Sequence, residues 1–333
     1  MRLPEFDYLE PATLEEVLSI LVDRQGEARV LAGGTDLLPL MKYGLRGPST
    51  ILSLKNITEL KGIILRDQEV FIGATTSLTD LLASPLIQEH FAALHQAVEA
   101  VAAPPLRNVA TIGGNLGQNT RCLYYNQSKT WRLERPPCFK AGGSLCHAVP
   151  KGKKCFSVYC GDLAPALMAL EGRLSIRRKN QSTIIPLQDL FTGNGLAPLN
   201  LAPDALITAV ILPLPGKRNG SSYVKIRLRS AVDYPLLSAA ASLTLQEGRR
   251  IEKAVLILGA VGPNPVIVET DQLFPGGKPD LIDRDTLGEI LRKKVQLVDN
   301  LALPGSYRRK ILPVVAEKAI RGALEAIPEK EQL

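Results

Sequence analysis

Residues 28–37 read ARVLAGGTDL, a short apolar run that leads into a pair of glycines. The run predicts a buried strand over residues 28–31, with a helix after the glycine turn. Gly33 and Gly34 allow positive φ values and let backbone N–H groups approach a phosphate, and Thr35 adds a hydroxyl donor. The turn has neither the G-x-G-x-x-G pattern of dinucleotide-binding folds nor the Gly-Lys-Ser/Thr of a Walker A loop. Taken alone, it fits a phosphate-binding turn or a simple tight turn.

Two more turns of small residues follow, VATIGGNL at residues 109–116 and IGAT at residues 72–75. Each comes directly after a short apolar run. Three such turns could line one elongated ligand from several sides, which a single turn could not do. A plain set of loops in an α/β domain is the alternative interpretation.

The first hundred residues alternate strand and helix patterns, which is typical of an α/β domain. Thr13 and Glu16 stand at capping-box distance at the start of the first predicted helix. Predicted helices lie at 11–21, 78–82, 90–101 and 162–170, and predicted strands at 28–31, 50–54, 69–74, 173–177 and 205–213.

The best domain boundary is PGKRNGSS at residues 215–222, where glycine, proline and polar residues interrupt the pattern. We therefore expect one domain over residues 1–216, with an internal boundary near 55–60, and a second domain over 217–333. The second domain should be a compact α+β unit. Its predicted strands lie at 223–228, 239–246 and 251–258, and its helices at 286–295 and 306–324.

Four of the five cysteines lie in one stretch, spaced C-x15-C-x7-C-x8-C over residues 122–155. The paired C-x2-4-C knuckles of zinc ribbons are missing, whereas iron–sulfur clusters accept wide and irregular spacing. The stretch therefore favours an iron–sulfur cluster, with zinc and scattered free thiols as alternatives. We interpret Cys160 as a buried thiol outside the ligand set, and His147 as a neighbour of the ligands.

Composition limits the class of protein. Hydrophobic residues make up 45% and charged residues 22%, which is ordinary for a globular protein. No apolar run reaches the roughly 18 residues of a membrane span, and the acidic start does not match a signal peptide. We therefore expect a cytoplasmic protein with no membrane partner. Reduced thiols in that compartment favour a metal site over disulfides.

The net charge of +7 comes partly from residues 132–154, 217–229 and 292–294. Aromatic residues are only 5% and no nucleic-acid motif accompanies these segments, so we expect no nucleic-acid partner. A solvated face or a docking surface for an acidic partner is the better interpretation. We see no Ser-His-Asp arrangement and no convincing carboxylate pair, so no catalytic residue is predicted.

The two glycine turns, Gly161-Asp162 and the C-terminal domain together resemble the FAD-binding subunit of the xanthine dehydrogenase family of molybdenum hydroxylases, over nearly the whole length. The resemblance implies an α+β fold. Its FAD-binding domain would have two α/β subdomains of the vanillyl-alcohol oxidase (PCMH) type and an iron–sulfur insert. A C-terminal α+β domain with a three-stranded sheet and helices would follow. Carried over by position, the FAD contacts would be Leu31, Ala32, Gly33, Gly34, Thr35, Asp36, Leu37, Val101, Thr111, Gly114, Asn115, Asp162, Ile207 and Lys225.

The resemblance also implies a role for each part of this set. The turn at 31–37 would wrap the pyrophosphate, and the members between 101 and 115 would lie along the ribityl chain and flavin. Asp162 would take ribityl or ribose hydroxyls. Ile207 would lie on the adenine side, and Lys225 near the flavin ring.

Most members of the family connect the GGN turn to the aspartate by a short segment, whereas this sequence runs from Asn115 to Asp162. The insert, about residues 119–160, reads TRCLYYNQS, then CFK, CHAV and CFS, followed by GDLAPALM. This wording resembles the subgroup of 4-hydroxybenzoyl-CoA reductase β subunits, whose insert carries a 4Fe–4S cluster. An aldehyde oxidoreductase group has a similar insert with different wording. By this resemblance the ligands would be Cys122, Cys138, Cys146 and Cys155, and the chain departs from the subgroup at Cys160.

The function implied is that of an electron-transfer flavoprotein subunit of an oxidoreductase used in anaerobic aromatic degradation. Its partners would be a large molybdenum-cofactor subunit and a small 2Fe–2S subunit, as a dimer of heterotrimers. A ferredoxin-like donor would supply electrons, which pass through 4Fe–4S and FAD to molybdenum for reductive dehydroxylation to benzoyl-CoA. One alternative is an aldehyde- or purine-oxidising member of the family. Another is a zinc-stabilised nucleotide-binding regulatory protein.

Overall fold

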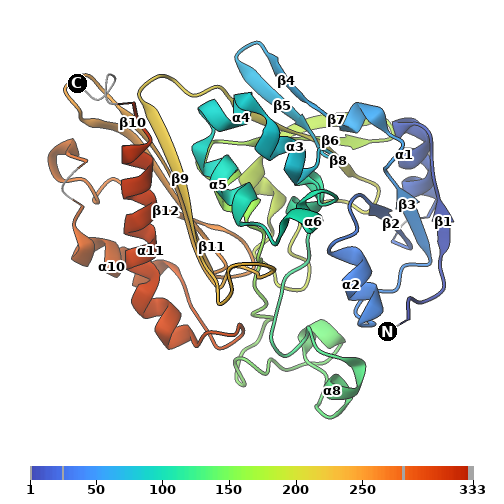
Figure 1. Cartoon of the computed structure of the whole chain (residues 1–333). Coiled ribbons are helices and arrows are strands. Elements are labelled where there is room, and N and C mark those ends of the chain that lie inside the picture. The colour runs from blue at the N-terminus through green and yellow to red at the C-terminus, as the bar shows by residue number, and fades with distance from the viewer. Residues whose placement is uncertain (1, 25, 280–281, 329–333) are drawn as a thin grey trace.

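The computed structural model describes residues 2–24, 26–279 and 282–328, and its strands form three sheets (Figure 1). The first sheet is parallel, with strand order β1-β3-β2. Helix α1 (Leu14–Asp23) covers it with four buried apolar side chains. The predicted cap is confirmed, because Thr13 Oγ1 accepts a hydrogen bond from the Glu16 N–H at 3.2 Å. The strands of this sheet are β1 (Asp7–Leu9), β2 (Ala28–Leu31) and β3 (Thr50–Ser53).

The second sheet is antiparallel throughout, with order β4-β5-β8-β6-β7. The strand–helix alternation that we read as α/β therefore produces a parallel sheet only in the first subdomain. Two strands of this sheet were not predicted, β4 and β7. Both lie at edges and expose most of their side chains, so they lack a clear apolar alternation. The strands are β4 (Ile63–Arg66), β5 (Glu69–Gly73), β6 (Arg173–Arg178), β7 (Gln181–Pro186) and β8 (Leu206–Pro213).

Short helices pack on the second sheet and form the largest core with it. The helix predicted over 90–101 is broken at Phe91, whose φ and ψ of −129° and 59° are not helical. The Phe91 side chain is fully buried at the break between α4 and α5. The helices are α3 (Leu78–Ala83), α4 (Pro85–His90), α5 (Ala92–Ala100), α6 (Pro104–Arg107), α7 (Ile112–Leu116) and α9 (Leu163–Ala169).

The third sheet has order β12-β11-β10-β9 and is also antiparallel. Helices α10 (Arg284–Lys294) and α11 (Gly305–Glu325) cover one face, and α5 contacts β9. The sequence predicts a three-stranded sheet in this domain, whereas the sheet has four strands. The fourth, β12, has only three residues at the sheet edge, too few for a periodic pattern. The strands are β9 (Asn219–Ile226), β10 (Leu237–Leu245), β11 (Ile251–Gly259) and β12 (Val266–Val268).

The cysteine-bearing segment leaves the body after α7 and returns before α9, carrying helix α8 (Lys129–Leu133) below it in Figure 1. The first sheet ends at Ser53 and the second begins at Ile63, on either side of the boundary predicted near 55–60. The third sheet begins at Asn219, just after the predicted division at 216/217. Within the described residues, no helix combines the length and the apolar character needed to cross a membrane.

Candidate cofactor site

Two adjoining cavities lie where the glycine turns meet. The larger, of about 500 Å³, is lined by residues 28–37 and 196–199, among others, and the smaller measures about 130 Å³. Thr35, Asp36 and Gly114 line both, so the two cavities adjoin at these residues. A volume of this order falls within the roughly 300–1,000 Å³ typical of small-molecule sites.

Close backbone contacts hold the turns together. A Cβ atom on Gly33 would lie 1.9 Å from the carbonyl oxygen of Val109, so only glycine allows this approach. A Cβ atom on Gly113 would lie 2.8 Å from Ala74. Thr111 caps the short helix α7 by accepting a hydrogen bond from the Gly114 N–H at 3.1 Å. The three turns singled out in the sequence therefore converge on one site.

The positions predicted as FAD contacts line these cavities, with one exception. Residues 31–37, Thr111, Gly114 and Ile207 line the larger cavity. The lining of the smaller cavity includes Thr35, Asp36, Val101, Gly114, Asn115 and Asp162. Lys225 lines neither cavity and lies behind Asp162, with only 3% of its side chain exposed.

Asp162 is the buried carboxylate of the smaller cavity. Burial raises its pKa, while the nearby Lys225 ammonium and the Tyr223 hydroxyl act in the opposite direction. The Lys225 Nζ atom lies 3.0 Å from the carboxylate, and the Tyr223 hydroxyl donates to it at 2.7 Å. Lys225 also donates to the carbonyl oxygens of Ala100 and Asp233, both at 2.9 Å. This network fixes β9 against the start of α9, and its member Asp162 lines the smaller cavity.

The two ends of the cysteine-bearing segment pair with each other. The Arg121 N–H donates to the Val158 carbonyl at 2.6 Å, and the Val158 N–H donates to the Arg121 carbonyl at 2.8 Å. The hydroxyls of Thr120 and Ser157 add a buried hydrogen bond of 2.8 Å. Because Cys122 follows Arg121 directly and Cys155 precedes Ser157 by two residues, this pairing brings the first and last of the four cysteines together.

A tight turn brings the middle two cysteines together. The Phe139 N–H donates to the Leu145 carbonyl at 2.8 Å, and the Gly143 N–H donates to the Cys138 carbonyl at 2.9 Å. Gly142 has a φ of 88°, which favours glycine. Cys146, the residue after Leu145, is buried, whereas Cys138 is partly exposed.

The four cysteines form no disulfides. Burial raises the pKa of Cys122 to about 11, and the sulfurs of Cys155 and Cys146 raise it further. Burial raises the pKa of the Tyr125 phenol, Arg46 and Arg132 lower it, and the nearby Cys138 and Cys155 contribute to the rise. Metal binding would have to displace these protons, since the thiolate is the ligand.

Four cysteines on one segment could serve two kinds of metal centre, a single zinc ion or an iron–sulfur cluster. Among the described residues, no group of three or more His, Cys, Asp or Glu side chains is arranged to hold a metal ion. A single zinc ion needs every sulfur at about 2.3 Å from one point. In a 4Fe–4S cluster each thiolate binds a different iron, so the sulfurs stand farther apart. The insert supplies the four thiols that such a cluster requires.

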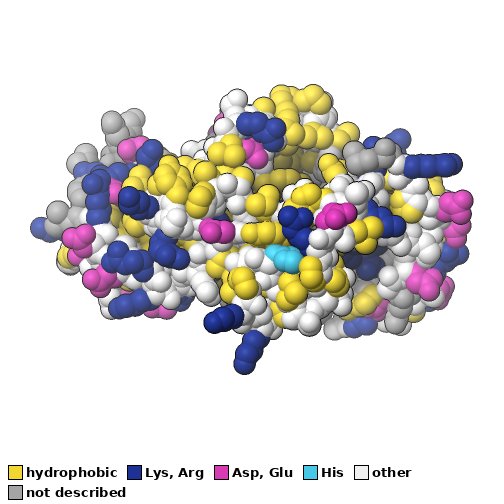
Figure 2. All heavy atoms as spheres, turned by 90° about the horizontal axis from the view of Figure 1, so that it is seen from below, with side chains coloured by type: hydrophobic (Ala, Val, Ile, Leu, Met, Phe, Trp, Pro, Cys, Tyr) yellow, Lys and Arg dark blue, Asp and Glu magenta, His cyan; other side chains and the backbone are white. Residues whose placement is uncertain are grey.

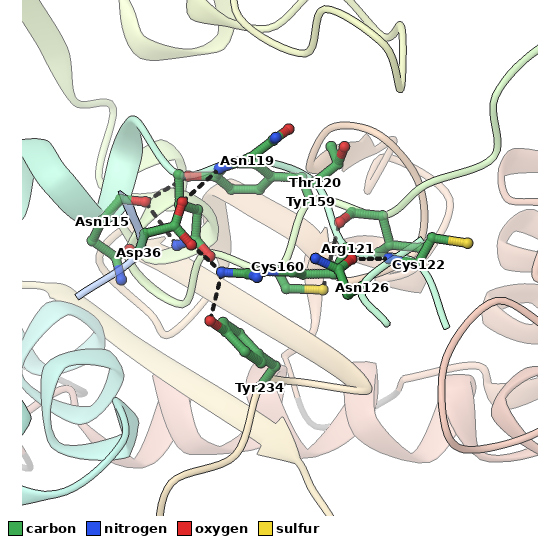
Figure 3. Close-up of polar contacts among 12 residues, drawn as sticks. Asp36, Asn115, Asn119, Thr120, Arg121, Cys122, Asn126, Tyr159, Cys160 and Tyr234 are labelled. Carbon is green, nitrogen blue, oxygen red and sulfur yellow. Dashed lines mark hydrogen bonds and ion pairs between the residues drawn. The ribbon is translucent and has the colours of Figure 1, made fainter. Parts of the chain in front are cut away.

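Arg121 ties the cysteine-bearing segment to the cavity (Figure 3). Its guanidinium forms an ion pair with Asp36 and donates to the Tyr234 hydroxyl at 2.6 Å, with the Tyr234 ring centroid 4.5 Å away. The Asn119 N–H donates to the same Asp36 carboxylate at 3.2 Å. Asp36 and Tyr234 both line the smaller cavity. The residue before the first cysteine therefore contacts two walls of the candidate site.

Cys160 and His147 do not belong to the group of four cysteines between residues 122 and 155. Cys160 is 1% exposed and lines the smaller cavity, and burial raises its pKa to about 12. It is thus a buried thiol, as expected from the sequence. The His147 ring lies beside Tyr124, and its Nε2 atom is 3.0 Å from the Pro136 carbonyl.

A family model described as the FAD binding domain in molybdopterin dehydrogenase matches residues 4–215. The chain belongs to this family. A second model, described as the CO dehydrogenase flavoprotein C-terminal domain, matches residues 222–323 of the chain. The chain is therefore an FAD-binding oxidoreductase subunit of the molybdenum hydroxylase family.

Relatives of this flavoprotein subunit span several enzymes. The aldehyde oxidoreductase FAD-binding subunit of Escherichia coli (strain K12) is 33% identical over 253 residues, which cover 73% of this chain and 77% of the relative. The xanthine dehydrogenase FAD-binding subunit of Escherichia coli O157:H7 is 25% identical and covers 98% of both chains. The structure of carbon monoxide dehydrogenase from Hydrogenophaga pseudoflava superposes with a TM-score of 0.79, at 20% identity, over 98% of this chain and 100% of that chain. This structural likeness confirms the fold.

Two arginines of the flavoprotein site were missed in the sequence. Arg29 and Arg46 both line the larger cavity, and within the described ranges neither guanidinium contacts a carboxylate. Burial lowers the pKa of Arg29, and electrostatic repulsion from the nearby Arg46 lowers it further. Arg29 could have been found, because it lies two residues before Leu31 and thus on the same strand face. Arg46 lies in a loop and has no local sequence signal.

Proposed function

We propose that one FAD occupies the joined cavities. Residues 31–37 would hold the pyrophosphate, and Ile207 would lie on the adenine side. Val101, Thr111, Gly114 and Asn115 would lie along the ribityl chain and flavin, and Asp162 would accept hydrogen bonds from ribityl or ribose hydroxyls. The two adjoining cavities at these positions support the proposal. Lys225 would act through Asp162, since it lies behind that carboxylate.

The two arginines of the larger cavity should bind the phosphates of FAD. Replacing Arg46 by glutamine should weaken FAD binding about tenfold, because a charge-assisted hydrogen bond is lost. Riboflavin has no phosphate, so its affinity should not change. Quenching of flavin fluorescence on addition to the deflavinated complex measures both affinities. Arg66→Gln, at an exposed position outside both cavities, is the matched control. Equal weakening of FAD and riboflavin by Arg46→Gln would contradict the assignment.

We further propose that Cys122, Cys138, Cys146 and Cys155 hold a 4Fe–4S cluster. Four free thiols on one insert, whose two ends pair with each other, support this. Neither family description mentions a cluster, so its presence is our inference from the insert. Bound there, the cluster would supply single-electron transfer, and the chain would position it through the paired ends of the insert.

The function that these features support best is that of the flavoprotein subunit of a molybdenum-dependent 4-hydroxybenzoyl-CoA reductase. A ferredoxin-like donor would deliver electrons to the insert, and FAD would pass them towards a 2Fe–2S subunit and a molybdenum subunit in a dimer of heterotrimers. There the phenolic hydroxyl would be removed to give benzoyl-CoA. The single observation that carries this proposal is a four-thiol insert fastened to the cofactor turn through Arg121 and Asp36.

A second candidate is an aldehyde- or purine-oxidising enzyme of the same family. The 33% identity to an aldehyde oxidoreductase subunit and the full-length match to a xanthine dehydrogenase subunit favour it. The purified complex, supplied with 4-hydroxybenzoyl-CoA and a reduced viologen, should form benzoyl-CoA. Turnover of an aldehyde or a purine, with none of the thioester, would reject the reductase and support the second candidate.

A further inference from the structure

The insert carries the whole net charge of the chain. Residues 119–160 contain eight lysines and arginines but a single acid, Glu134. The rest of the chain then has 32 basic and 32 acidic residues, since the totals are 40 and 33. A segment of about an eighth of the chain is therefore strongly positive on an otherwise balanced protein. Such local charge creates a field that selects and steers partners of opposite sign.

Most of this charge faces solvent. Lys129, Arg135, Lys151, Lys153 and Lys154 are exposed, and within the described part of the chain none of them has a carboxylate partner. Figure 2 views the molecule from the side of the insert, and lysine and arginine side chains project from that face. Other cations of the insert bind groups within the protein. Arg121 pairs with Asp36, and Lys140 donates to the Thr120 carbonyl at 2.9 Å.

A basic groove continues this face. A cavity of about 580 Å³ opens between the insert and the end of α2 (Leu37–Lys42). Its lining has four cations, no acid and several small or apolar residues. The cations are Arg2, Lys42, Arg46 and Lys129.

The groove lies between the two candidate redox sites. Arg46 lines both the groove and the larger cofactor cavity. The insert is fastened to the opposite wall, where Tyr125 donates to the Leu45 carbonyl at 3.3 Å and Arg132 to the Gly44 carbonyl at 3.4 Å. The Tyr125 N–H in turn donates to the carbonyl oxygen of Cys122 at 3.0 Å. A protein seated in the groove would thus lie beside the thiols and beside the cofactor cavity.

We propose that this basic face, made of the groove and the exposed cations of the insert, is the docking site of an acidic one-electron carrier protein. The inference rests on the proposed cluster and adds the place and chemistry of its donor. The reduced carrier would lose one electron and the cluster would gain it, with no bond broken and no proton moved. Opposite charges would align the carrier over the insert and raise the association rate, which salt would then reduce.

The test compares two charge reversals in the assembled complex. The variant K129E/R135E changes the docking face, and K310E/K318E makes the same change in charge on exposed positions of α11. Reduction by a dithionite-reduced bacterial ferredoxin is followed by stopped-flow absorbance, and binding of the oxidised ferredoxin by calorimetry. At low salt the first variant should lose about tenfold or more in the second-order rate and in affinity. The second variant should match the parent.

Reduction by methyl viologen, a small cation, should not be slower in either variant than in the parent, because a basic face does not attract it. Added salt should bring the parent rate down to that of K129E/R135E. Equal ferredoxin affinity in all three proteins would overturn the proposal, as would failure of K129E/R135E to assemble, which would make the face a subunit interface. Iron is measured in each sample first. A parent complex without iron rejects the cluster, whereas the calorimetric comparison still decides whether the face binds the carrier.

Discussion

Replacing Cys146 by serine is expected to remove nearly all iron from the insert while FAD stays bound. Cys146 is the one buried member of the four thiols, so neither water nor the weaker serine oxygen can replace its sulfur at low cost. The FAD-binding turn at 31–37 contacts the insert through Arg121 and Asn119 rather than through Cys146, so it should keep its shape. Iron, acid-labile sulfide and flavin absorbance, measured on anaerobically purified complex, give the result directly.

Cys160→Ala is the matched control for this experiment. Cys160 is also buried but is not one of the four proposed ligands. The iron content of this variant should therefore equal that of the parent protein. Loss of FAD with iron retained in Cys146→Ser would contradict our assignment of the ligands. One zinc per chain with no iron and no flavin in the parent would instead support a zinc-stabilised regulatory protein.

Replacing Gly33 by alanine should abolish FAD binding and destabilise the fold. The added Cβ atom would lie 1.9 Å from the Val109 carbonyl oxygen, and both groups are backbone, so no side-chain rotation relieves the clash. The two turns must move apart, and the cavity between them opens. We expect a loss of about 3 kcal/mol in the free energy of unfolding, the upper end for overpacked sites. Chemical denaturation and flavin content measure the two effects.

Gly47→Ala separates this clash from a general effect of losing glycine. A Cβ atom on Gly47 would meet no atom within 4 Å, so this variant should keep both its FAD and its stability. If Gly33→Ala bound FAD like the parent protein, the close approach of the two turns would have no part in holding the cofactor.

Local patterns predicted much of this fold and site. Thr13 and Glu16 cap a helix through neighbouring atoms, and the glycine turns depend on the conformations of a few consecutive residues. Such features are written in short stretches of sequence. Edge strands are different, because partners far along the chain decide their pairing. The pairing of β11 with β12 thus involves only three residues of the shorter strand.

The parts of the site that escaped prediction depend on long-range packing. Arg121 meets Asp36 across 85 residues, and no spacing rule connects the two. Arg46 reaches the larger cavity from a loop with no pattern of its own. Lys225 lines neither cavity, and its ammonium is held by Asp162 and two carbonyl oxygens. Its place depends on how β9 packs against α9, which the sequence of neither element reveals.

The pairing of Arg121 with Val158 has a consequence for how such a subunit can evolve. Because the chain leaves and re-enters the body at hydrogen-bonded neighbours, residues 122–157 form a loop whose ends already meet. Lengthening a loop closed in this way costs little, about 0.6 kcal/mol for each doubling of its length. The core beneath would be unchanged with a short link in its place. A flavoprotein of this architecture can therefore gain or lose the four-cysteine insert as a single module, without redesign of its core.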